Sequence, residues 1–298
     1  MQTKVEKILD GNFLKKQILN ELNKEVDDLY TQFNKRPGLA VILVGHNAAS
    51  KVYVGKKKQA CELVGIKSYE YLLPDNIEED ELIELIKSLN KDDKINGILL
   101  QLPLPRHLEE QKLLHLIDPK KDVDGFHPEN VGKLLLGLDT FKSCTPYGIV
   151  TLLDFFNIDT EGKHVVIVGR SNIVGKPLAA MLVQRSNPGN ATVTICHSKS
   201  KNLSEITKQA DILIAAIGQP NFIKQDMVKP ETVIIDVGIN RVEDPLEKGK
   251  YKLVGDVDFK DVFDKSSQIT PVPGGVGALT IAMLMKNTIQ AFKELNKL

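Results

Sequence analysis

The sequence predicts an α/β protein made of two domains, each built around a parallel β-sheet. The chain has 298 residues, which exceeds the size of one ordinary domain. Short apolar runs alternate with longer stretches of helical spacing, an order typical of parallel sheets covered by helices on both faces. In the stretch 164–177, an apolar strand runs directly into a glycine-bounded loop and a helix start.

The first expected element is an amphipathic helix over residues 12–33. Asp10 is placed to cap this helix, and Pro37-Gly38 ends it. Apolar side chains recur at helical spacing and predict one buried stripe. The stripe consists of Leu14, Ile18, Leu22, Val26 and Leu29.

The first domain continues as alternating strands and helices. Strands are expected at Leu39–Val44, Lys67–Leu73 and Gly97–Leu102, with helices at Ser50–Val64 and Glu78–Leu89 between them. Single connections between successive strands indicate parallel pairing. This part of the chain has no glycine-rich phosphate loop.

The second domain follows a polar connection, Asp118–Pro128, and a helix over Pro146–Asn157. Apolar, β-branched runs predict its strands. They are expected at residues 164–168, 191–196, 211–216, 232–237 and 251–254.

The C-terminal helix is expected to return to the first domain. Its apolar stripe runs over Leu279–Leu295 and requires a partner surface. We therefore assign residues 1–145 and the helix 276–298 to the first domain and residues 146–275 to the second, with a cleft between the two.

The stretch around Gly169 predicts that the second domain is of the Rossmann, dinucleotide-binding type. Gly169 and Gly175 bound a tight turn, and Pro177 lies in the first turn of the following helix, where its missing N–H costs nothing. Backbone amides at such a helix start, aided by the helix dipole, attract a pyrophosphate.

The charges of this region favour NADP over NAD. A site for NAD usually places an acid at the end of the second strand, where it binds the ribose 2′-hydroxyl. No Asp or Glu occurs from Arg170 through Ser204, whereas Arg170 and Ser198 suit a 2′-phosphate. The alternative is that the basic residues here are ordinary solvated side chains. They are Arg170, Lys176, Arg185, Lys199 and Lys201.

Composition places the chain among soluble globular proteins. Its hydrophobic fraction is 42% and its charged fraction 26%, and 39 Lys and Arg balance 39 Asp and Glu. We expect no nucleic-acid or membrane partner, and the weakly apolar N-terminus predicts a cytoplasmic protein. The cysteines at 61, 144 and 196 are odd in number and far apart, and the six histidines lack ligand spacing, so we expect neither a disulfide framework nor a metal.

Four chemically versatile residues share one face of the helix over 50–64. Ser50, Tyr53, Lys57 and Cys61 recur at i, i+3, i+7 and i+11. Partial burial beside an aromatic and a thiol is expected to lower the pKa of Lys57 toward neutrality, which suits a proton-transfer residue. The alternative is a lysine whose stem covers an apolar face while its head remains in water.

Two polar residues are expected near the same end of the first sheet. Gln101 ends the apolar strand Gly97–Leu102, and Asp124 lies in the loop Lys121-Asp-Val-Asp-Gly125. Ligands of open α/β sheets bind beyond the carboxyl ends of the strands, which is where both side chains are expected. The alternative for Asp124 is a turn-forming role before the glycine.

Several blocks of sequence with a distinctive pattern extend across almost the whole chain. The blocks are Ser50-x-x-Tyr53-x-x-x-Lys57, Gly97-Ile-Leu-Leu-Gln-Leu-Pro-Leu-Pro105, Lys121-Asp-Val-Asp-Gly-Phe126, Gly169-Arg-Ser-x-x-Val-Gly-x-Pro177, Ala210-Asp-Ile-x-Ile-Ala-Ala-x-Gly218, Ile235-Asp-Val-Gly-Ile-Asn240 and Pro271-Val-Pro-Gly-Gly-Val-Gly277. Together, and in this order, they resemble one enzyme family, the bifunctional methylenetetrahydrofolate dehydrogenase and methenyltetrahydrofolate cyclohydrolase. Gln59, Ser143, Ser200 and Ala278 depart from the residues usual in the family.

The resemblance implies a homodimer that binds folate in the interdomain cleft and NADP on the second domain. It implies NADP-dependent oxidation of 5,10-methylenetetrahydrofolate and hydrolysis of the methenyl product to 10-formyltetrahydrofolate. Lys57 matches the catalytic lysine, Gln101 its amide partner, Tyr53 the residue that stacks on the pterin and Asp124 the anchor of the pterin amino group.

The remaining implied contacts come from the same blocks. Folate contacts are expected at Ser50, Tyr53, Gln101, Leu102, Pro103, Asp124, Pro273, Gly274 and Gly277. Cofactor contacts are expected at Gly169, Arg170, Ser171, Val174, Gly175, His197, Ser198, Ala216, Gly218, Val237, Gly238, Ile239 and Thr280.

Two other functions remain open at this level. A shikimate-type dehydrogenase also pairs a lysine with an aspartate on a two-domain frame. A non-catalytic dinucleotide-binding regulator would keep the segment Gly169–Ser198 without needing Lys57, Gln101 and Asp124 together.

Overall fold

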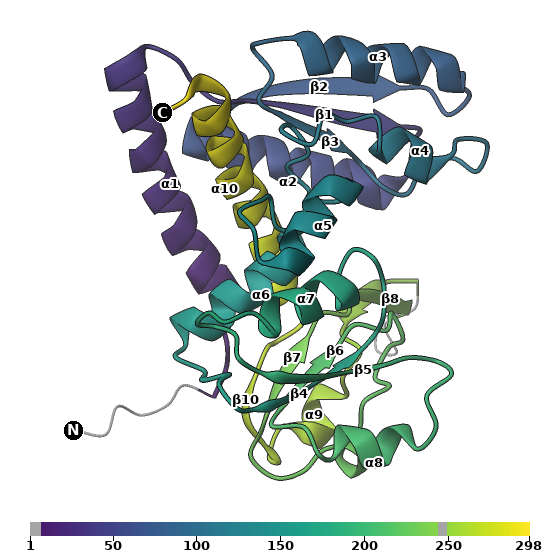
Figure 1. Cartoon of the computed structure of the whole chain (residues 1–298). Helices are drawn as coiled ribbons and strands as arrows, with labels where there is room; N and C mark the ends of the chain where they lie inside the picture. Colours follow the sequence, from purple (N-terminus) through teal and green to yellow (C-terminus); the bar gives the residue numbers. More distant parts are fainter. Residues whose placement is uncertain (1–6, 244–248) are drawn as a thin grey trace. The chain divides into compact units, whose positions relative to one another are not determined.

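The computed structural model describes residues 7–243 and 249–298, which divide into two compact units. One contains Lys16–Cys144 and Ile281–Leu298 and is called here the three-stranded unit. The other contains residues 7–15 and Thr145–Thr280 and is called the five-stranded unit. Both are of the α/β class that the sequence predicts (Figure 1).

The three-stranded unit has a parallel sheet of order β2-β1-β3. The expected alternation of strands and helices is confirmed, although β3 ends at Leu100, so Gln101 follows the strand instead of closing it. The helices α4 and α5 were not anticipated. The elements are α1 Gly11–Phe33, β1 Gly38–Val44, α2 Ala48–Val64, β2 Lys67–Leu73, α3 Glu79–Lys91, β3 Gly97–Leu100, α4 Glu110–Leu114, α5 Pro128–Leu136 and α10 Val276–Asn296.

The start of α1 follows the predicted chemistry. The Asp10 carboxylate accepts hydrogen bonds from the backbone N–H groups of Asn12, at 2.9 Å, and Phe13, at 3.0 Å. These are donors that a helix start otherwise leaves without partners. All five residues of the predicted apolar stripe are buried.

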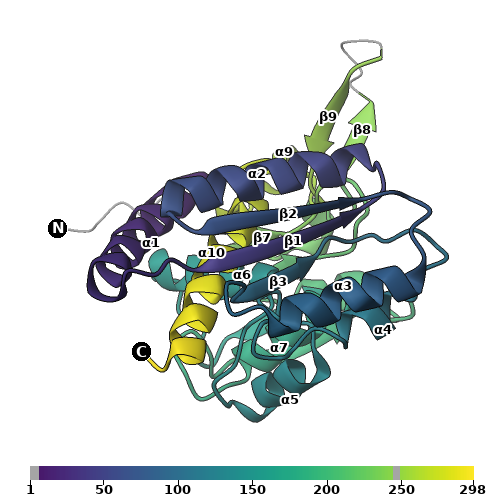
Figure 2. The same ribbon diagram turned by 90° about the horizontal axis from the view of Figure 1, so that it is seen from above.

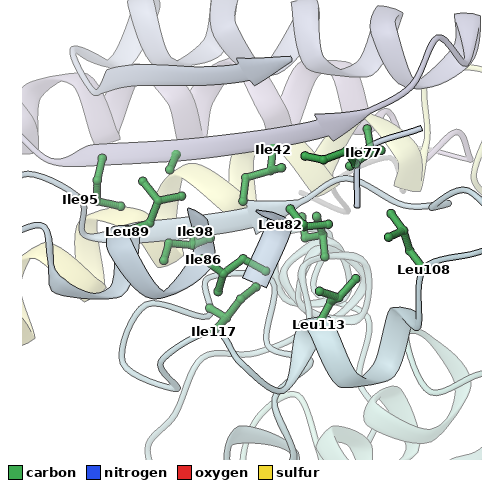
Figure 3. Close-up of a cluster of buried hydrophobic side chains, with 13 residues drawn as sticks. Ile42, Ile77, Leu82, Ile86, Leu89, Ile95, Ile98, Leu108, Leu113 and Ile117 are labelled. Carbon is green, nitrogen blue, oxygen red and sulfur yellow. The ribbon is translucent and has the colours of Figure 1, made fainter. Parts of the chain in front are cut away.

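The core of the three-stranded unit lies between the sheet and α3. Ile42 of β1 and Ile98 of β3 meet Leu82 and Ile86 of α3 in one buried cluster (Figure 3). The intervening side chains of β1, such as Val41, point to the opposite face of the sheet and are also buried. Helix α2 packs against β1 on the side of the sheet opposite α3 (Figures 1 and 2). Both faces are therefore covered, as expected of a parallel sheet.

The five-stranded unit has a parallel sheet of order β10-β7-β6-β4-β5. Strand β4 lies between β5 and β6, so the strand order reverses beside it, which is where ligands bind in doubly wound sheets. The elements are α6 Cys144–Phe155, β4 His164–Val168, α7 Gly175–Leu182, β5 Thr192–Cys196, α8 Leu203–Thr207, β6 Ile212–Ala215, η1 Gln225–Met227, β7 Thr232–Asp236, β8 Asn240–Glu243, β9 Tyr251–Val254, α9 Phe259–Val262 and β10 Ser266–Ile269.

The fifth parallel strand is not the one that the sequence indicated. Tyr251–Val254 forms β9, but it pairs antiparallel with β8 in a separate hairpin. The edge strand of the parallel sheet is instead β10, whose sequence Ser-Ser-Gln-Ile carries one apolar residue. A strand that is buried by its neighbours needs no apolar run of its own, and periodicity therefore missed it.

The N-terminal segment belongs to the edge of the same sheet. Leu9 N–H donates to the Ile269 carbonyl at 2.9 Å, and Ile269 N–H donates to the Lys7 carbonyl at 2.8 Å. Residues 7–15 thus group with the five-stranded unit, whereas the sequence-based division had placed them with the first domain. Among the described residues, no helix is long and apolar enough to span a bilayer.

Candidate active site

A buried lysine lies at the centre of the candidate site in the three-stranded unit. Lys57 of α2 is only 8% exposed, and its Nζ donates a hydrogen bond to Oε1 of Gln101 at 2.8 Å. The amide is fixed in turn, because its Nε2 donates to the Leu102 carbonyl at 2.7 Å. Ser50 and Cys61 are buried along the same helix, as the spacing predicts.

The two neighbouring lysines are directed elsewhere. Lys58 forms an ion pair of 2.9 Å with Glu70 of β2, and Lys56 lies 5.9 Å from the ring centroid of Tyr53. The Tyr53 ring is partly exposed, one helical turn before Lys57. Only Lys57 among the three lysines therefore faces the interior.

Burial and one carboxylate act on Lys57 in opposite directions. Desolvation lowers the pKa of the Lys57 ammonium, and the nearby Asp124 charge raises it. The predicted direction for Lys57 is confirmed, and a lysine whose pKa is lowered by burial is better suited to proton transfer near neutral pH than a solvated one. Desolvation likewise raises the pKa of Asp124, and the charge of Lys57 opposes that rise.

The turn-forming role considered for Asp124 belongs to Asp122. Oδ2 of Asp122 accepts hydrogen bonds from the His127 backbone N–H and from Nδ2 of Asn130, both at 2.8 Å. The Asp124 carboxylate accepts a hydrogen bond from the Cys144 thiol and lies close enough to Lys57 for the two charges to interact. The Asp124 carboxylate is therefore available to the site, because Asp122 accepts the hydrogen bonds of the turn.

In the five-stranded unit, the loop after β4 has the compact geometry expected of a phosphate loop. Gly169 has a φ of +142°, and a Cβ on it would lie 2.2 Å from the Ala216 carbonyl oxygen. A Cβ on Gly175 would lie 2.1 Å from the Gly169 oxygen. The Ser171 hydroxyl accepts from the Val174 N–H at 3.1 Å, which closes the turn.

Because of this packing, Gly169→Ala is expected to destabilise the chain by ~1–3 kcal/mol. The substitution adds a Cβ at a positive φ and against a backbone oxygen. Chemical denaturation would measure the loss. Gly132→Ala is the matched control, since Gly132 lies in α5 with open space around it and gains helix propensity. Equal stability of the two variants would contradict the packing argument.

The loops after β4 and β5 lie at the same edge of the sheet. Val168 pairs with Cys196, and Gly169 N–H donates to the Cys196 carbonyl at 2.9 Å, so Arg170 and Ser198 each follow a paired residue by two positions. Both side chains are exposed, and within the described residues Arg170 has no partner. His197 is held in a turn by Ser200, whose hydroxyl accepts from the His197 N–H at 2.9 Å.

Two buried aspartates that sequence reasoning missed shape the loops after β6 and β7. Oδ2 of Asp256 accepts from the N–H groups of Ile217, at 2.6 Å, and Gly218, at 2.9 Å. Oδ1 of Asp236 accepts from Gly238 N–H at 2.9 Å, and burial raises the pKa of Asp236 to about 6. The available signal was the position of each acid at a strand end, since Asp236 is the last residue of β7 and Asp256 lies two residues after β9.

The remaining predicted residues also lie in the five-stranded unit. A Cβ on Gly277 would lie 2.6 Å from Cδ1 of Ile239, and the Thr280 and Thr145 hydroxyls are 3.2 Å apart. Pro273 and Gly274 form the turn before α10, where the Gly274 carbonyl accepts from Asn12 N–H at 3.0 Å. Val237 N–H donates to the Ala215 carbonyl at 2.9 Å, at the carboxyl end of the sheet.

The predicted catalytic, folate and cofactor residues thus divide between the two units. The three-stranded unit carries Ser50, Tyr53, Lys57, Gln101, Leu102, Pro103 and Asp124, and the five-stranded unit carries the others. A Rossmann-type sheet with a tight glycine-bounded loop after β4, together with a buried lysine on a second α/β unit, is the organisation of two-domain dehydrogenases that use a nicotinamide dinucleotide.

Within that class, the chain belongs to the tetrahydrofolate dehydrogenase/cyclohydrolase family. The model of the family's catalytic domain matches residues 9–124, and that of its NAD(P)-binding domain matches residues 143–296. The family predicted from the sequence blocks is therefore confirmed.

Individual relatives match over nearly the whole chain. The Bifunctional protein FolD of Chlorobium phaeobacteroides is 53% identical over 293 residues, covering 98% of this chain and 99% of its own. The crystal structure of the bifunctional FolD dehydrogenase/cyclohydrolase from Campylobacter jejuni is 51% identical, with a TM-score of 0.91 over 98% of this chain and 99% of its own.

A third relative was solved with ligands. The Trypanosoma brucei FolD, complexed with NADP cofactor and inhibitor, is 36% identical, with a TM-score of 0.92 and 98% coverage of both chains. The shikimate dehydrogenase of Aquifex aeolicus is 14% identical with a TM-score of 0.51, so it shares the fold alone.

Proposed function

We propose that this chain oxidises 5,10-methylenetetrahydrofolate with NADP and hydrolyses the resulting methenyl cation to 10-formyltetrahydrofolate, as part of one-carbon metabolism. Membership of the family supports the reaction class. The observation that carries the proposal, through its hydrolytic half, is the buried Lys57 held by Gln101 beside Asp124. A dinucleotide-binding regulator would have no use for that cluster.

The residues of the five-stranded unit fit a bound NADP. The exposed guanidinium of Arg170 and the hydroxyl of Ser198 suit the 2′-phosphate, and no acid from 170 to 204 repels it. The amides around Gly175, at the start of α7, suit the pyrophosphate. Bound NADP would supply the acceptor for a hydride, and the chain's part in that step is to orient the two reactants.

The oxidation requires little proton chemistry from the chain. Removing hydride from a methylene carbon between two nitrogens gives an amidinium cation stabilised by resonance, and no proton leaves. As the resemblance to the family implies, we assign Tyr53 to stacking on the pterin and Asp124 to the pterin amino group. The structure is consistent with this, since Tyr53 lies one helical turn before Lys57 and the Asp124 charge acts on Lys57. Ser50, Leu102, Pro103, Pro273, Gly274 and Gly277 complete the proposed folate contacts.

The hydrolysis places different demands on the site. Water must lose a proton as it attacks the cation, and a ring nitrogen must gain one as the carbinolamine opens. Lys57 is proposed to take the first proton and give the second, while Gln101 fixes the direction of its Nζ. Burial favours this role because it disfavours the ammonium and so increases the fraction of free amine.

An absorbance assay tests the assignment of both activities to one chain. Purified protein is mixed with methylenetetrahydrofolate and NADP, and NADPH and the methenyl species are followed separately. We expect NADPH to form while methenyl stays below it and decays faster than in buffer. Methenyl accumulating one for one with NADPH would remove the hydrolytic role from Lys57, and no NADPH would remove the proposed function.

The assembly and location are part of the same proposal. We propose a cytoplasmic homodimer with no nucleic-acid or membrane partner, in which the three-stranded unit supplies most of the folate contacts and the five-stranded unit supplies the contacts to NADP. The three buried free thiols suit a reducing compartment. Light scattering during size-exclusion chromatography would give the mass, and a value near 33.1 kDa would contradict the dimer.

A further inference from the structure

A buried asparagine of the C-terminal helix cross-links two loops that flank Lys57. Asn287 lies in α10 with no solvent exposure. Its Nδ2 donates hydrogen bonds to the Val123 carbonyl at 2.8 Å and to the Lys142 carbonyl at 2.9 Å. The first acceptor immediately precedes Asp124, and the second lies two residues before Cys144.

The two loops make further contacts at this point. The Cys144 thiol lies 3.5 Å from the Val123 carbonyl and within reach of the Asp124 carboxylate. Nδ2 of Asn287 is also 3.8 Å from Cys144 Sγ. A Cβ on Gly125 would lie 2.7 Å from the Ser143 nitrogen, so the loops are packed backbone to backbone.

The cost of this arrangement indicates that it serves more than packing. Oδ1 of Asn287 is buried without a hydrogen-bond partner in the described part of the chain. A buried acceptor left without a partner is unfavourable, and an apolar residue would avoid that cost. An asparagine is explained if its two N–H donors are needed to hold both carbonyls.

We propose that Asn287 is a positioning residue, which fixes the backbone on either side of the site so that Asp124 faces Lys57 and the folate. The inference rests on the proposed role of Asp124. Its consequence is that α10 contributes to folate binding without touching the substrate. Substitution of Asn287 should then weaken folate binding in the same way as substitution of Asp124, but to a smaller extent.

The test compares three variants by kinetics and by calorimetric titration with tetrahydrofolate. Asn287→Leu keeps the size of the side chain and removes both donors, and Asp124→Asn removes the proposed anchor. Thr288→Val is the matched control, because Thr288 is equally buried on α10 but its hydroxyl donates within the helix, to the Leu284 carbonyl at 2.8 Å. All assays are run well below the unfolding temperature of each variant.

Asn287→Leu is expected to raise the folate KM and dissociation constant by about five- to tenfold, with the KM of NADP unchanged. It should also shift the rising part of the pH–rate profile of hydrolysis to lower pH, and Asp124→Asn should have the same effect. The reason is that the Asp124 charge raises the pKa of Lys57, whose other ionisable neighbours are Cys61 and Cys144. Thr288→Val should change neither quantity.

Each outcome has a distinct meaning. Weaker folate binding in Asp124→Asn but not in Asn287→Leu would overturn the inference and leave the site intact. Unchanged folate binding in Asp124→Asn would overturn the assignment of the site itself, and the inference with it. If Asn287→Leu does not fold, Asn287→Ser replaces it; one hydroxyl donor should give a smaller rise in folate KM, and no rise would overturn the inference.

Discussion

Lys57→Met is expected to abolish the hydrolysis of methenyltetrahydrofolate and to leave measurable hydride transfer. Methionine preserves the length and the apolar stem of the side chain, so α2 keeps its packing. Loss of a general acid and base costs about 10²–10⁴-fold in rate. The oxidation involves no proton transfer and should lose far less. Both rates are measured on one preparation, by release of NADPH and by decay of added methenyltetrahydrofolate.

Two companion variants separate proton transfer from charge. Lys57→Arg keeps the cation but cannot lose its proton near neutral pH, so it should be as poor in hydrolysis as Lys57→Met. Lys58→Met removes a neighbouring surface cation, whose pair with Glu70 is worth little, and should leave both rates near wild type. Equal loss of both activities in folded Lys57→Met would contradict the proposal that Lys57 serves the hydrolysis and not the hydride transfer.

The pH dependence of hydrolysis follows from the same burial. Attack by water needs Lys57 as the free amine, so the rate should rise with pH through the pKa of this group. Desolvation disfavours the ammonium and lowers that pKa from 10.5. The rate of hydrolysis should therefore rise at a pH below that at which an ordinary lysine titrates. A stopped-flow profile of methenyl decay between pH 6 and about 10 would test it. A rise at or above 10.5 would contradict the burial argument.

The parts of the site that the sequence could predict are those with a local pattern. The spacing from Ser50 to Cys61 fixes one helical face whatever the tertiary structure, and the strand before Gln101 fixes the end of the sheet where it lies. The roles of Gly169 and Gly175 in the loop could be predicted for a similar reason, because only glycine fits so close to a backbone oxygen.

The parts that could not be predicted depend on distant segments. Asn287 is separated by 164 residues from Val123 and by 145 from Lys142, and nothing in the helical pattern of α10 distinguishes it from a core position. Strand β10 is polar and is defined by its pairing with β7. Asp256 was missed because its role is to hold the N–H groups of Ile217 and Gly218, some 40 residues earlier in the chain.

Substitution of Arg170 distinguishes the two interpretations of the basic residues after β4, as contacts to the cofactor or as ordinary solvated side chains. Arg170→Ala is expected to raise the KM of NADP by roughly 10–100-fold, since hydrogen bonds to a charged group contribute about 1.5–3 kcal/mol. The KM of NAD, which lacks the 2′-phosphate, should change little. Steady-state oxidation of methylenetetrahydrofolate with each dinucleotide gives both values.

The matched control for this prediction is Arg185→Ala. Arg185 is an exposed arginine beyond the other end of α7, so its loss changes the net charge equally without removing a group from the loop after β4. Long-range attraction of the cofactor would be weakened in both variants and would fade with added salt. A direct contact with the 2′-phosphate would instead be lost in Arg170→Ala alone. If the KM values of NADP and NAD rise together in Arg170→Ala, Arg170 does not bind the 2′-phosphate, and the preference for NADP must come from Ser198 and the absence of acids between residues 170 and 204.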